Sequence, residues 1–351
     1  MTTPGAAVRT WILHALGGWN RFWFTPALPH TLALMRMLAG AMILYTHLVW
    51  TLDLSAFLGP DSWITGDVAR QVHAANAERM GASASLAWSH LWYIDSPAVL
   101  WVAHVAALAV LAMFMLGLFT RVTSILTWLL VVSYCHRLTG SLFGLDQINA
   151  MLAMYLMLAP CGSVWSLDRL LARRRGGKLS PVAATVSANV ATRLIQLHMC
   201  FVYLFGGIAK MRGVTWWDGS AMWLSVANYE YQSLDMTWLV HVPLLVSLLT
   251  HMTVFWEAFY CALVWPRLTR PLILLMAVAV HGGIALFLGM ITFGLVMLIG
   301  NLAFIAPETV ERCRISLVRG LGRWRAGQGS AAVPVPTSAR AGHPAGQRSG
   351  K

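Results

Sequence analysis

The chain has 351 residues, of which 58% are hydrophobic and only 11% are charged, and its mean hydropathy is +0.64. Soluble domains carry about 25% charged residues, so the composition excludes a soluble globular domain and predicts an all-α, multi-spanning membrane protein. The formal net charge of +12 does not indicate nucleic-acid binding, because the basic residues gather in short loops and the C-terminal tail. The five cysteines are scattered without any metal-ligand spacing, so neither a disulfide framework nor a metal site is predicted.

Residues 1–30 are predicted to contain a helix that lies in the cytoplasmic membrane interface. Apolar and aromatic residues recur at helical spacing within 6–24, beside polar residues such as Arg9. The segment is too short and too amphipathic to span a bilayer. Pro26 and Pro29 follow it and favour its end.

Residues 31–306 are predicted to form one transmembrane domain of about eight helices. Each helix corresponds to an apolar run bounded by polar residues, glycine or proline. The expected spans are 32–52, 97–119, 122–137, 147–160, 188–210, 241–265, 272–288 and 291–305. The last two runs are short and punctuated by glycine, so 272–305 is either two spans or a re-entrant pair.

The charge distribution predicts the topology and the nature of the tail. With a cytoplasmic N-terminus, eight crossings place Arg121, the loop 166–178, the turn 267–270 and the C-terminus inside the cell. Residues 307–351 are predicted to form a basic, largely disordered cytoplasmic tail, since the chain beyond about Gly327 has almost no large apolar residue.

One face of the fifth span carries polar and small residues in a segment otherwise suited to lipid. The residues, at steps of three and four, are Gln196, Met199, Tyr203, Gly206 and Lys210. A lysine at the end of a membrane helix commonly snorkels to water as an anchor, beside interfacial tryptophans such as Trp216 and Trp217. The alternative is a functional lysine at the edge of an outward-opening apolar cavity, near Tyr203 and the loop around Asp218.

Further polar residues lie within the apolar runs, and Glu257 is the most demanding of them. A carboxylate in the membrane must be neutral, paired or facing water, and Arg36, Arg193 and His281 are the candidate partners. Arg36, Glu257 and His251 are candidates for an intramembrane polar network, although His251 and Glu257 project from different faces of their helix. For each histidine alone, the alternative is a buried imidazole bonded to a backbone carbonyl.

The string Tyr203-Leu204-Phe205-Gly206-Gly207-Ile208-Ala209-Lys210, followed by Trp216-Trp217-Asp218-Gly219, resembles the central motif of the vitamin K-dependent gamma-carboxylase family. It is similar above all to the bacterial branch of that family, the horizontally transferred transmembrane (HTTM) domain proteins. Other pieces agree in order along 32–306, namely 34–40, 57–60, 165–168, Glu257 and 281–285.

The resemblance implies a quinol-dependent carboxylase in the inner membrane of a bacterium, with Lys210 as its base. In that family, reduced vitamin K reacts with oxygen, and the resulting strong base removes a proton from a glutamyl side chain, to which carbon dioxide adds. The implied cofactor is a menaquinol-type reduced vitamin K, and the implied partners are the lipid bilayer and a glutamyl peptide. The implied outward-facing quinone pocket consists of Tyr203, Gly206, Gly207, Trp216, Trp217, Asp218 and His281.

The chain departs from the animal carboxylases in two places. Those enzymes have an Asn-His pair near the start of the fourth span, where this chain reads Phe143-Gly144-Leu145-Asp146-Gln147. The large lumenal region that follows their membrane core is replaced here by the basic tail. The alternative function is therefore a non-enzymatic membrane protein of the same fold that binds a lipid, a quinone or a partner protein.

Overall fold

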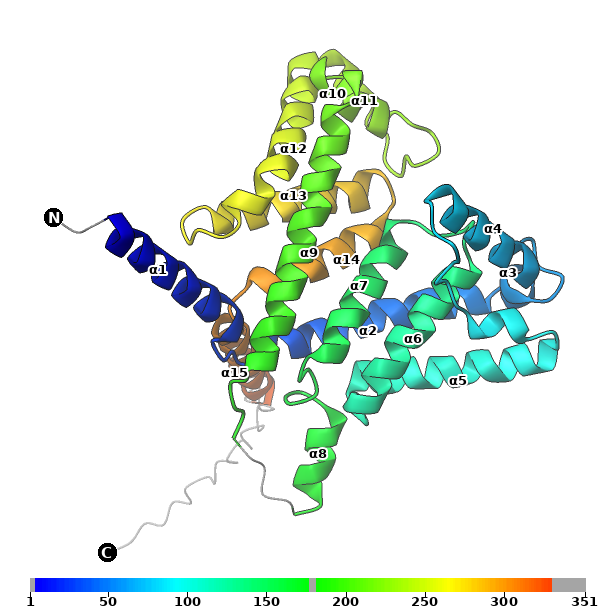
Figure 1. The fold of residues 1–351 in the computed structure, drawn as a ribbon, viewed down its shortest axis with the longest axis horizontal. Helices are drawn as coiled ribbons and strands as arrows, with labels where there is room; N and C mark the ends of the chain where they lie inside the picture. The colour runs from blue at the N-terminus through cyan, green and yellow to red at the C-terminus, as the bar shows by residue number, and fades with distance from the viewer. Residues whose placement is uncertain (1–3, 177–180, 330–351) are drawn as a thin grey trace, which may run out of the picture. The chain divides into compact units, whose positions relative to one another are not determined.

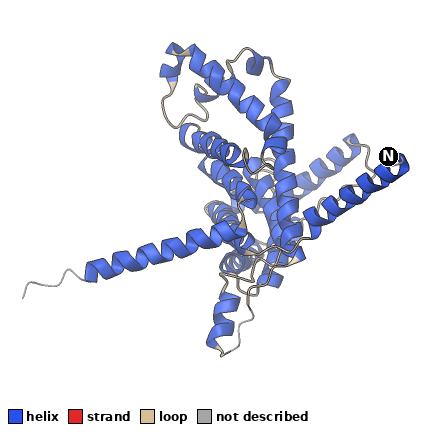
Figure 2. Cartoon of the chain, turned by 90° about the vertical axis from the view of Figure 1, so that its left-hand side faces the viewer, coloured by secondary structure: helices blue, strands red, loops and turns tan. Residues whose placement is uncertain are grey.

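The computed structural model of the chain describes residues 4–176 and 181–329 (Figure 1). The chain separates into two compact units, Met1–Val310 and Glu311–Lys351. Helices make up the secondary structure of the described residues, with no strand beyond an isolated antiparallel bridge between Ala27 and Thr185 (Figure 2). The predicted all-α fold is thus confirmed.

Helices cover all eight of the expected spans. They are α2 (His30–Thr51), α5 (Pro97–Leu116), α6 (Thr120–Arg137), α7 (Gly144–Leu158), α9 (Val186–Met211), α12 (Pro243–Leu263), α13 (Arg270–Phe287) and α14 (Ile291–Asn301). Short helices lie between them: α3 (Leu54–Leu58), α4 (Gly66–Arg79), η1 (His90–Tyr93), α8 (Leu167–Arg174), α10 (Val214–Trp217), α11 (Ala221–Val226), η2 (Thr237–His241) and η3 (Leu302–Phe304).

Five helices of the described chain are long and apolar enough to cross a membrane: α2, α5, α9, α12 and α13. A sixth crossing results if Ile291–Phe304 and Pro307–Gly320 together form one bent span. By contrast, α7 has 15 residues and α14 has 11, which is short for a bilayer of about 30 Å at 1.5 Å per residue. The chain therefore has the helices of an integral membrane protein, and the count of eight crossings stays a prediction.

The N-terminal helix α1 (Pro4–Phe24) is held at its C-terminal end and otherwise exposes apolar side chains. The amide nitrogen of Asn189 on α9 donates to the carbonyl oxygens of Phe22 (2.7 Å) and Trp23 (2.8 Å). The guanidinium of Arg193 stacks over the Phe22 ring at 4.4 Å. Trp11 and Trp19 are exposed, as suits a helix expected in the membrane interface.

The tail differs from its prediction over its first part. Helix α15 (Pro307–Gly329) occupies the segment in which irregular backbone was expected. Proline at the first position, Glu308 in the first turn and apolar residues such as Leu317 among the arginines account for the helix. The part predicted to be disordered lies, beyond residue 329, outside the described residues.

The helices α13 and α14 form a hairpin joined by residues 288–290. Its turn contains Gly289, whose φ of +67° lies in the left-handed region that glycine adopts without strain. A side chain at Gly294 of α14 would collide with the carbonyl of His281 on α13, so this glycine allows the two helices to approach closely. The structure therefore has two consecutive helices over 272–305, of which α13 alone is long enough to span.

The main hydrophobic core lies among α2, α7, α9, α12 and α14. Its fully buried residues include Met35, Leu152, Met199, Tyr260 and Val296. Burial of these side chains determines which face of α9 points into the core. The polar residues on that face, such as Gln196 and Tyr203, are therefore buried as well.

Candidate functional site between α9 and α12

An ion pair joins Lys210, in the last turn of α9, to Glu257 on α12. Lys210 Nζ lies 2.6 Å from Glu257 Oε2, and the two side chains are 27% and 10% exposed. The lysine is thus partly enclosed, and the indole of Trp216 lies 5.4 Å from its ammonium group. Glu257 faces the bundle interior as expected, but its partner is neither Arg36, Arg193 nor His281.

Two glycines let α9 and α12 approach closely beside this pair. A Cβ atom at Gly207 would lie 2.7 Å from the backbone nitrogen of Ala258, a distance that no side chain tolerates. A Cβ atom at Gly206 would lie 3.3 Å from Glu257 Oε2. The glycines therefore act as packing positions that bring the carboxylate of α12 against the backbone of α9.

A buried cluster of hydrogen bonds lies deeper in the bundle, seven residues or about 10 Å along α9 from Lys210. Its members are Tyr203 on α9, Tyr260 on α12, His281 on α13 and Asn301 at the end of α14. The ring of Trp256 packs against Tyr203 at 4.9 Å and against His281 at 6.1 Å. Four helices thus each contribute one polar side chain to the same buried hydrogen-bonded cluster.

The donor and acceptor of each hydrogen bond in this cluster can be assigned, because a backbone carbonyl can only accept and therefore identifies the amide nitrogen of Asn301. Asn301 Nδ2 lies 2.9 Å from the Met297 oxygen, so Oδ1 faces Tyr260 and accepts its proton at 2.6 Å. Asn301 Nδ2 also donates to the Tyr203 hydroxyl (2.8 Å), which in turn donates to His281 Nε2 at 2.7 Å. Neutral His281 then carries its proton on Nδ1, a buried atom without a hydrogen-bond partner among the described residues.

The segment after Lys210 forms a short helix and a turn against α12. Trp216 and Trp217 belong to α10, where a loop was expected. The carboxylate of Asp218 accepts hydrogen bonds from Ser220 (2.6 Å from Oγ, 2.9 Å from N), and these bonds hold the pKa of that exposed carboxyl below its ordinary value. Gly219 has a φ of +84° and packs on Ser247.

Asp218 and Trp217 therefore shape the turn and do not contact Lys210. The Trp217 indole donates to the carbonyl of Met211 (2.5 Å), and its own carbonyl oxygen lies 3.2 Å from His251 Nε2. A cavity of about 350 Å³ adjoins Trp216 on α10, lined also by Leu288 and other residues, but Lys210 does not line it. Of the residues Trp216, Trp217 and Asp218, which were expected near Lys210, Trp216 is the one whose side chain lies beside the Lys210 ammonium group.

The expected network of Arg36, Glu257 and His251 does not form. Arg36 is fully buried and donates to the carbonyl of Trp165 (2.6 Å) at the other end of the bundle. The half-buried His251 lies with Nδ1 2.8 Å from the carbonyl oxygen of Ser247, so it bonds to a backbone carbonyl of its own helix. The reason is geometric: Arg36 lies near the start of α2, at the end of the bundle that carries the basic loops.

Sequence reasoning missed Tyr260 and Asn301, as well as the pairing of Lys210 with Glu257. An asparagine within an apolar run and a tyrosine three residues after Glu257 are the signals that could have drawn attention to them. In the described part of the chain, no group of three or more His, Cys, Asp or Glu side chains is arranged to hold a metal ion.

Comparison with known proteins identifies a distant bacterial relative. The chain is 27% identical over 207 residues to an uncharacterized protein, YitO, of Bacillus subtilis. The alignment covers 54% of this chain and 62% of YitO, so the chain spans less than two thirds of the relative's length. No protein-family model matches the chain. No solved structure matches it.

Proposed function

We propose that the chain is a membrane enzyme of the HTTM branch, related to the vitamin K-dependent gamma-carboxylases, with Lys210 as the base at an outward-facing quinone site. The observation that carries the proposal is the contact of Lys210 Nζ with Glu257 Oε2 at 2.6 Å, at the edge of the membrane core. Both residues belong to the strings that carry the family resemblance.

The pair gives Lys210 a route to its neutral form. In this partly enclosed site, the ammonium–carboxylate pair and the amine–carboxylic acid pair differ by the position of one proton along a short hydrogen bond. When the proton rests on Glu257, the amine of Lys210 is neutral and can accept a proton from a substrate. Glu257 thereby acts as the store for the proton that Lys210 must lose.

Bound at this site, a menaquinol-type quinol would supply, with oxygen, the base strength needed to remove a glutamyl proton before carbon dioxide adds. At the site itself, Trp216 offers an aromatic face beside Lys210. His281 Nδ1, a buried donor without a hydrogen-bond partner among the described residues, lies deeper, at the level of Tyr203. Lys210 and Glu257 hold and move the proton, while the packing of α9 against α12 limits the access of water to Glu257.

We place this protein in the inner membrane of a bacterium, with eight crossings and both termini in the cytoplasm. Its contacts there are the lipid bilayer and a glutamyl peptide that approaches from the outer side. Support comes from the basic loops, which lie at one end of the bundle with Arg36 and Trp165, while Lys210 lies at the other end of α9 from Arg193.

A second candidate function is a non-enzymatic membrane protein that binds a lipid, a quinone or a partner protein through the same fold. The observation in its favour is again the ion pair, because a salt bridge to Glu257 fully accounts for a lysine in this position without any chemistry. The start of the fourth span also supports this function. Where the animal carboxylases have an Asn-His pair, this chain has Asp146, whose carboxylate accepts a hydrogen bond from the backbone nitrogen of Phe143 (3.1 Å) and caps α7.

The deciding experiment measures quinol- and oxygen-dependent fixation of labelled carbon dioxide into a glutamyl peptide by the purified protein in lipid. We expect Lys210→Ala to lower the rate by about 100-fold or more, the usual contribution of a general base. Lys210→Arg should fail as well, because arginine keeps its charge and cannot act as a base.

The arginine variant separates the two candidate functions. Arginine can replace an anchoring or structural lysine and still pair with Glu257. A fully active Lys210→Arg protein would therefore remove the catalytic assignment. A wild-type protein that is inactive with every quinol tested would favour the non-enzymatic function.

A further inference from the structure

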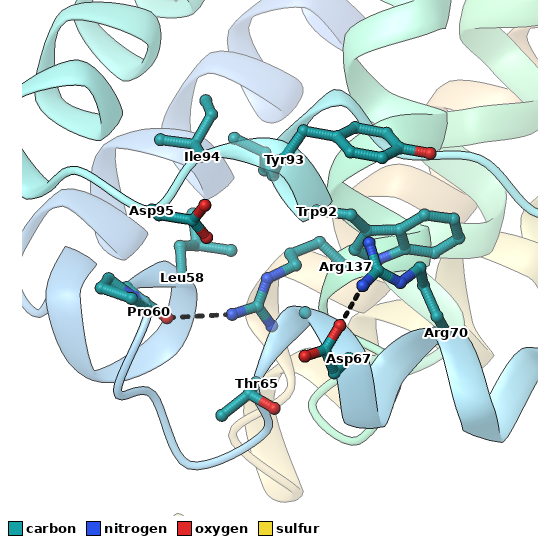
Figure 3. Close-up of a pocket in the computed structure, with 13 residues that line it drawn as sticks. Leu58, Pro60, Thr65, Asp67, Arg70, Trp92, Tyr93, Ile94, Asp95 and Arg137 are labelled. Atoms are coloured by element: carbon teal, nitrogen blue, oxygen red, sulfur yellow. Dashed lines mark hydrogen bonds and ion pairs between the residues drawn. The ribbon is translucent and has the colours of Figure 1, made fainter.

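A polar cavity of about 350 Å³ lies far in sequence from the Lys210 pair, beside the C-terminal end of α6 (Figure 3). Its walls are the turn after α3, the start of α4, and η1 with the two residues that follow it, Ile94 and Asp95. No residue of α9 or α12 lines it. The cavity is therefore separate from the site considered above.

Arg137 forms one wall of this cavity and is only 1% exposed. Its guanidinium donates to the carbonyl oxygens of Ile64 (2.5 Å) and Gly59 (3.2 Å) and to the hydroxyl of Ser62 (2.6 Å). These bonds tie the turn after α3 to α6, but all three acceptors are neutral. No carboxylate forms an ion pair with Arg137 among the described residues, so its charge is uncompensated and poorly screened.

A carboxylate faces the same cavity without reaching this cation. Figure 3 shows Asp95 on the opposite side of the cavity from Thr65, with Arg137 between them. The other charged residues of the wall, Asp67 and Arg70, pair with each other and cancel. The cavity is thus lined by one guanidinium and one carboxylate that form no ion pair with each other or with any other described residue.

We propose that this cavity binds a small zwitterion that carries an oxyanion close to an ammonium group. The oxyanion would lie at Arg137, because guanidinium groups favour carboxylate and phosphate oxygens, and the ammonium group at Asp95. The volume is at the lower end of the range for small-molecule sites, which suits a molecule of this size. Two sources share the chemistry: a free α-amino acid and the phosphoethanolamine headgroup of a lipid.

Two binding measurements on the intact protein distinguish the sources. The first is calorimetric titration of the protein in phosphatidylglycerol nanodiscs with glycine and with O-phosphoethanolamine. The second is native mass spectrometry of the protein from mixed phosphatidylethanolamine and phosphatidylglycerol bilayers, which reports lipid that stays bound. Binding of glycine indicates the amino acid, whereas retained phosphatidylethanolamine and binding of O-phosphoethanolamine alone indicate the headgroup.

The decisive variant is Asp95→Asn, because Asp95 is exposed and forms no ion pair with the other described residues. It should weaken binding about tenfold, the effect of losing one charge-assisted hydrogen bond. Asp53→Asn is the matched control, an exposed carboxylate of the same segment outside the cavity, and should bind like the wild type. Equal binding by the Asp95→Asn and wild-type proteins overturns the proposal, as does the absence of binding in both measurements.

Discussion

Lys210 and Glu257 each make the presence of the other tolerable in an apolar bundle. With 10% of its side chain exposed, Glu257 has little access to water, whereas Lys210 at 27% is partly hydrated. Removing the carboxylate therefore leaves a cation that can turn to water, but removing the lysine leaves an enclosed anion. A variant that lacks the Glu257 carboxylate should therefore be more stable than a variant that lacks the Lys210 ammonium group.

We expect Glu257→Gln to destabilise the protein by about 1 kcal/mol and Glu257→Lys by about 3 kcal/mol or more, since the second change places two ammonium groups together. Melting temperatures of the purified variants in one detergent measure the difference. A Lys210→Met, Glu257→Gln double variant serves as the control and should be more stable than Glu257→Lys. Equal stability of Glu257→Gln and Glu257→Lys would contradict an enclosed site.

Asp168 illustrates a charged residue with a purely structural role. Its carboxylate accepts hydrogen bonds from the backbone nitrogens of Phe119 (2.7 Å) and Thr120 (2.9 Å) and from the Thr120 hydroxyl (2.8 Å), at the start of α6. Partial burial opposes the charged form, but the bonds from Thr120 and Phe119 and the charge of Arg36 outweigh it and hold the pKa of Asp168 below its ordinary 3.8.

This lowered pKa predicts a loss of stability in acid. The stabilisation by Asp168 is complete above its unfolded pKa and is lost as the pH falls through the lower, folded value. We expect Asp168→Asn to be less stable at pH 7 and to lose less stability than the wild type on acidification below 3.8. Thermal unfolding across pH, with Asp53→Asn as the control, tests this, and parallel profiles for wild type and Asp168→Asn would refute it.

At the scale of elements, the site depends on how closely α9 and α12 pack. Gly207 permits backbone contact between α9 and Ala258 of α12. This contact fixes the position of α12 along α9 and thereby places Glu257 beside Gly206 and Lys210. Any side chain at Gly207 must push the helices apart, which lengthens the 2.6 Å hydrogen bond as well as weakening the packing.

We therefore expect Gly207→Ala to lower stability by about 1–3 kcal/mol, the usual effect of overpacking, and to impair any activity that depends on Lys210. Gly282→Ala is the matched control, because a Cβ atom at Gly282 would meet nothing within 4 Å. It should change stability by less than about 1 kcal/mol. Similar melting temperatures for the two variants would show that α9 and α12 do not pack as closely as described.

The positions of the helices could be predicted from the sequence, but most of the contacts between them could not. Apolar runs of 15–20 residues identify membrane helices because composition alone determines whether a segment suits lipid. The partner of Glu257 lies 47 residues away, and its identity depends on which face α12 presents to α9. The same limit hid Asn301, whose bonds to Tyr203 and Tyr260 join three helices.

Arg36 shows a second limit of sequence reasoning. An arginine in an apolar run suggested an acidic partner, but its bond goes to the backbone carbonyl of Trp165. Trp165 has a φ of +49°, a conformation that L-residues rarely adopt and that composition does not reveal. In the structure, the carbonyl of this residue receives the buried guanidinium of Arg36.

At the scale of the whole molecule, the arrangement of the helices agrees with the distribution of charge. The bonds of Arg36 to Trp165 and of Thr31 to the carbonyl of Ile305 (3.1 Å) join segments that the positive-inside rule assigns to one side. Asp168 connects the turn between α5 and α6 to the same end. The number of crossings and the side of the membrane that this end faces stay predictions.

This arrangement predicts opposite sides of the membrane for two glycines, Gly176 after α8 and Gly219 after α10. Reporters fused to chains truncated at these positions should give cytoplasmic signal at Gly176, where arginines gather, and external signal at Gly219, beyond Lys210. Truncation at Gly81, in the acidic segment before η1, is the control and should report the same side as Gly219. The same side for Gly176 and Gly219 would rule out a crossing by α9, and with it the outward-facing position proposed for the Lys210–Glu257 pair.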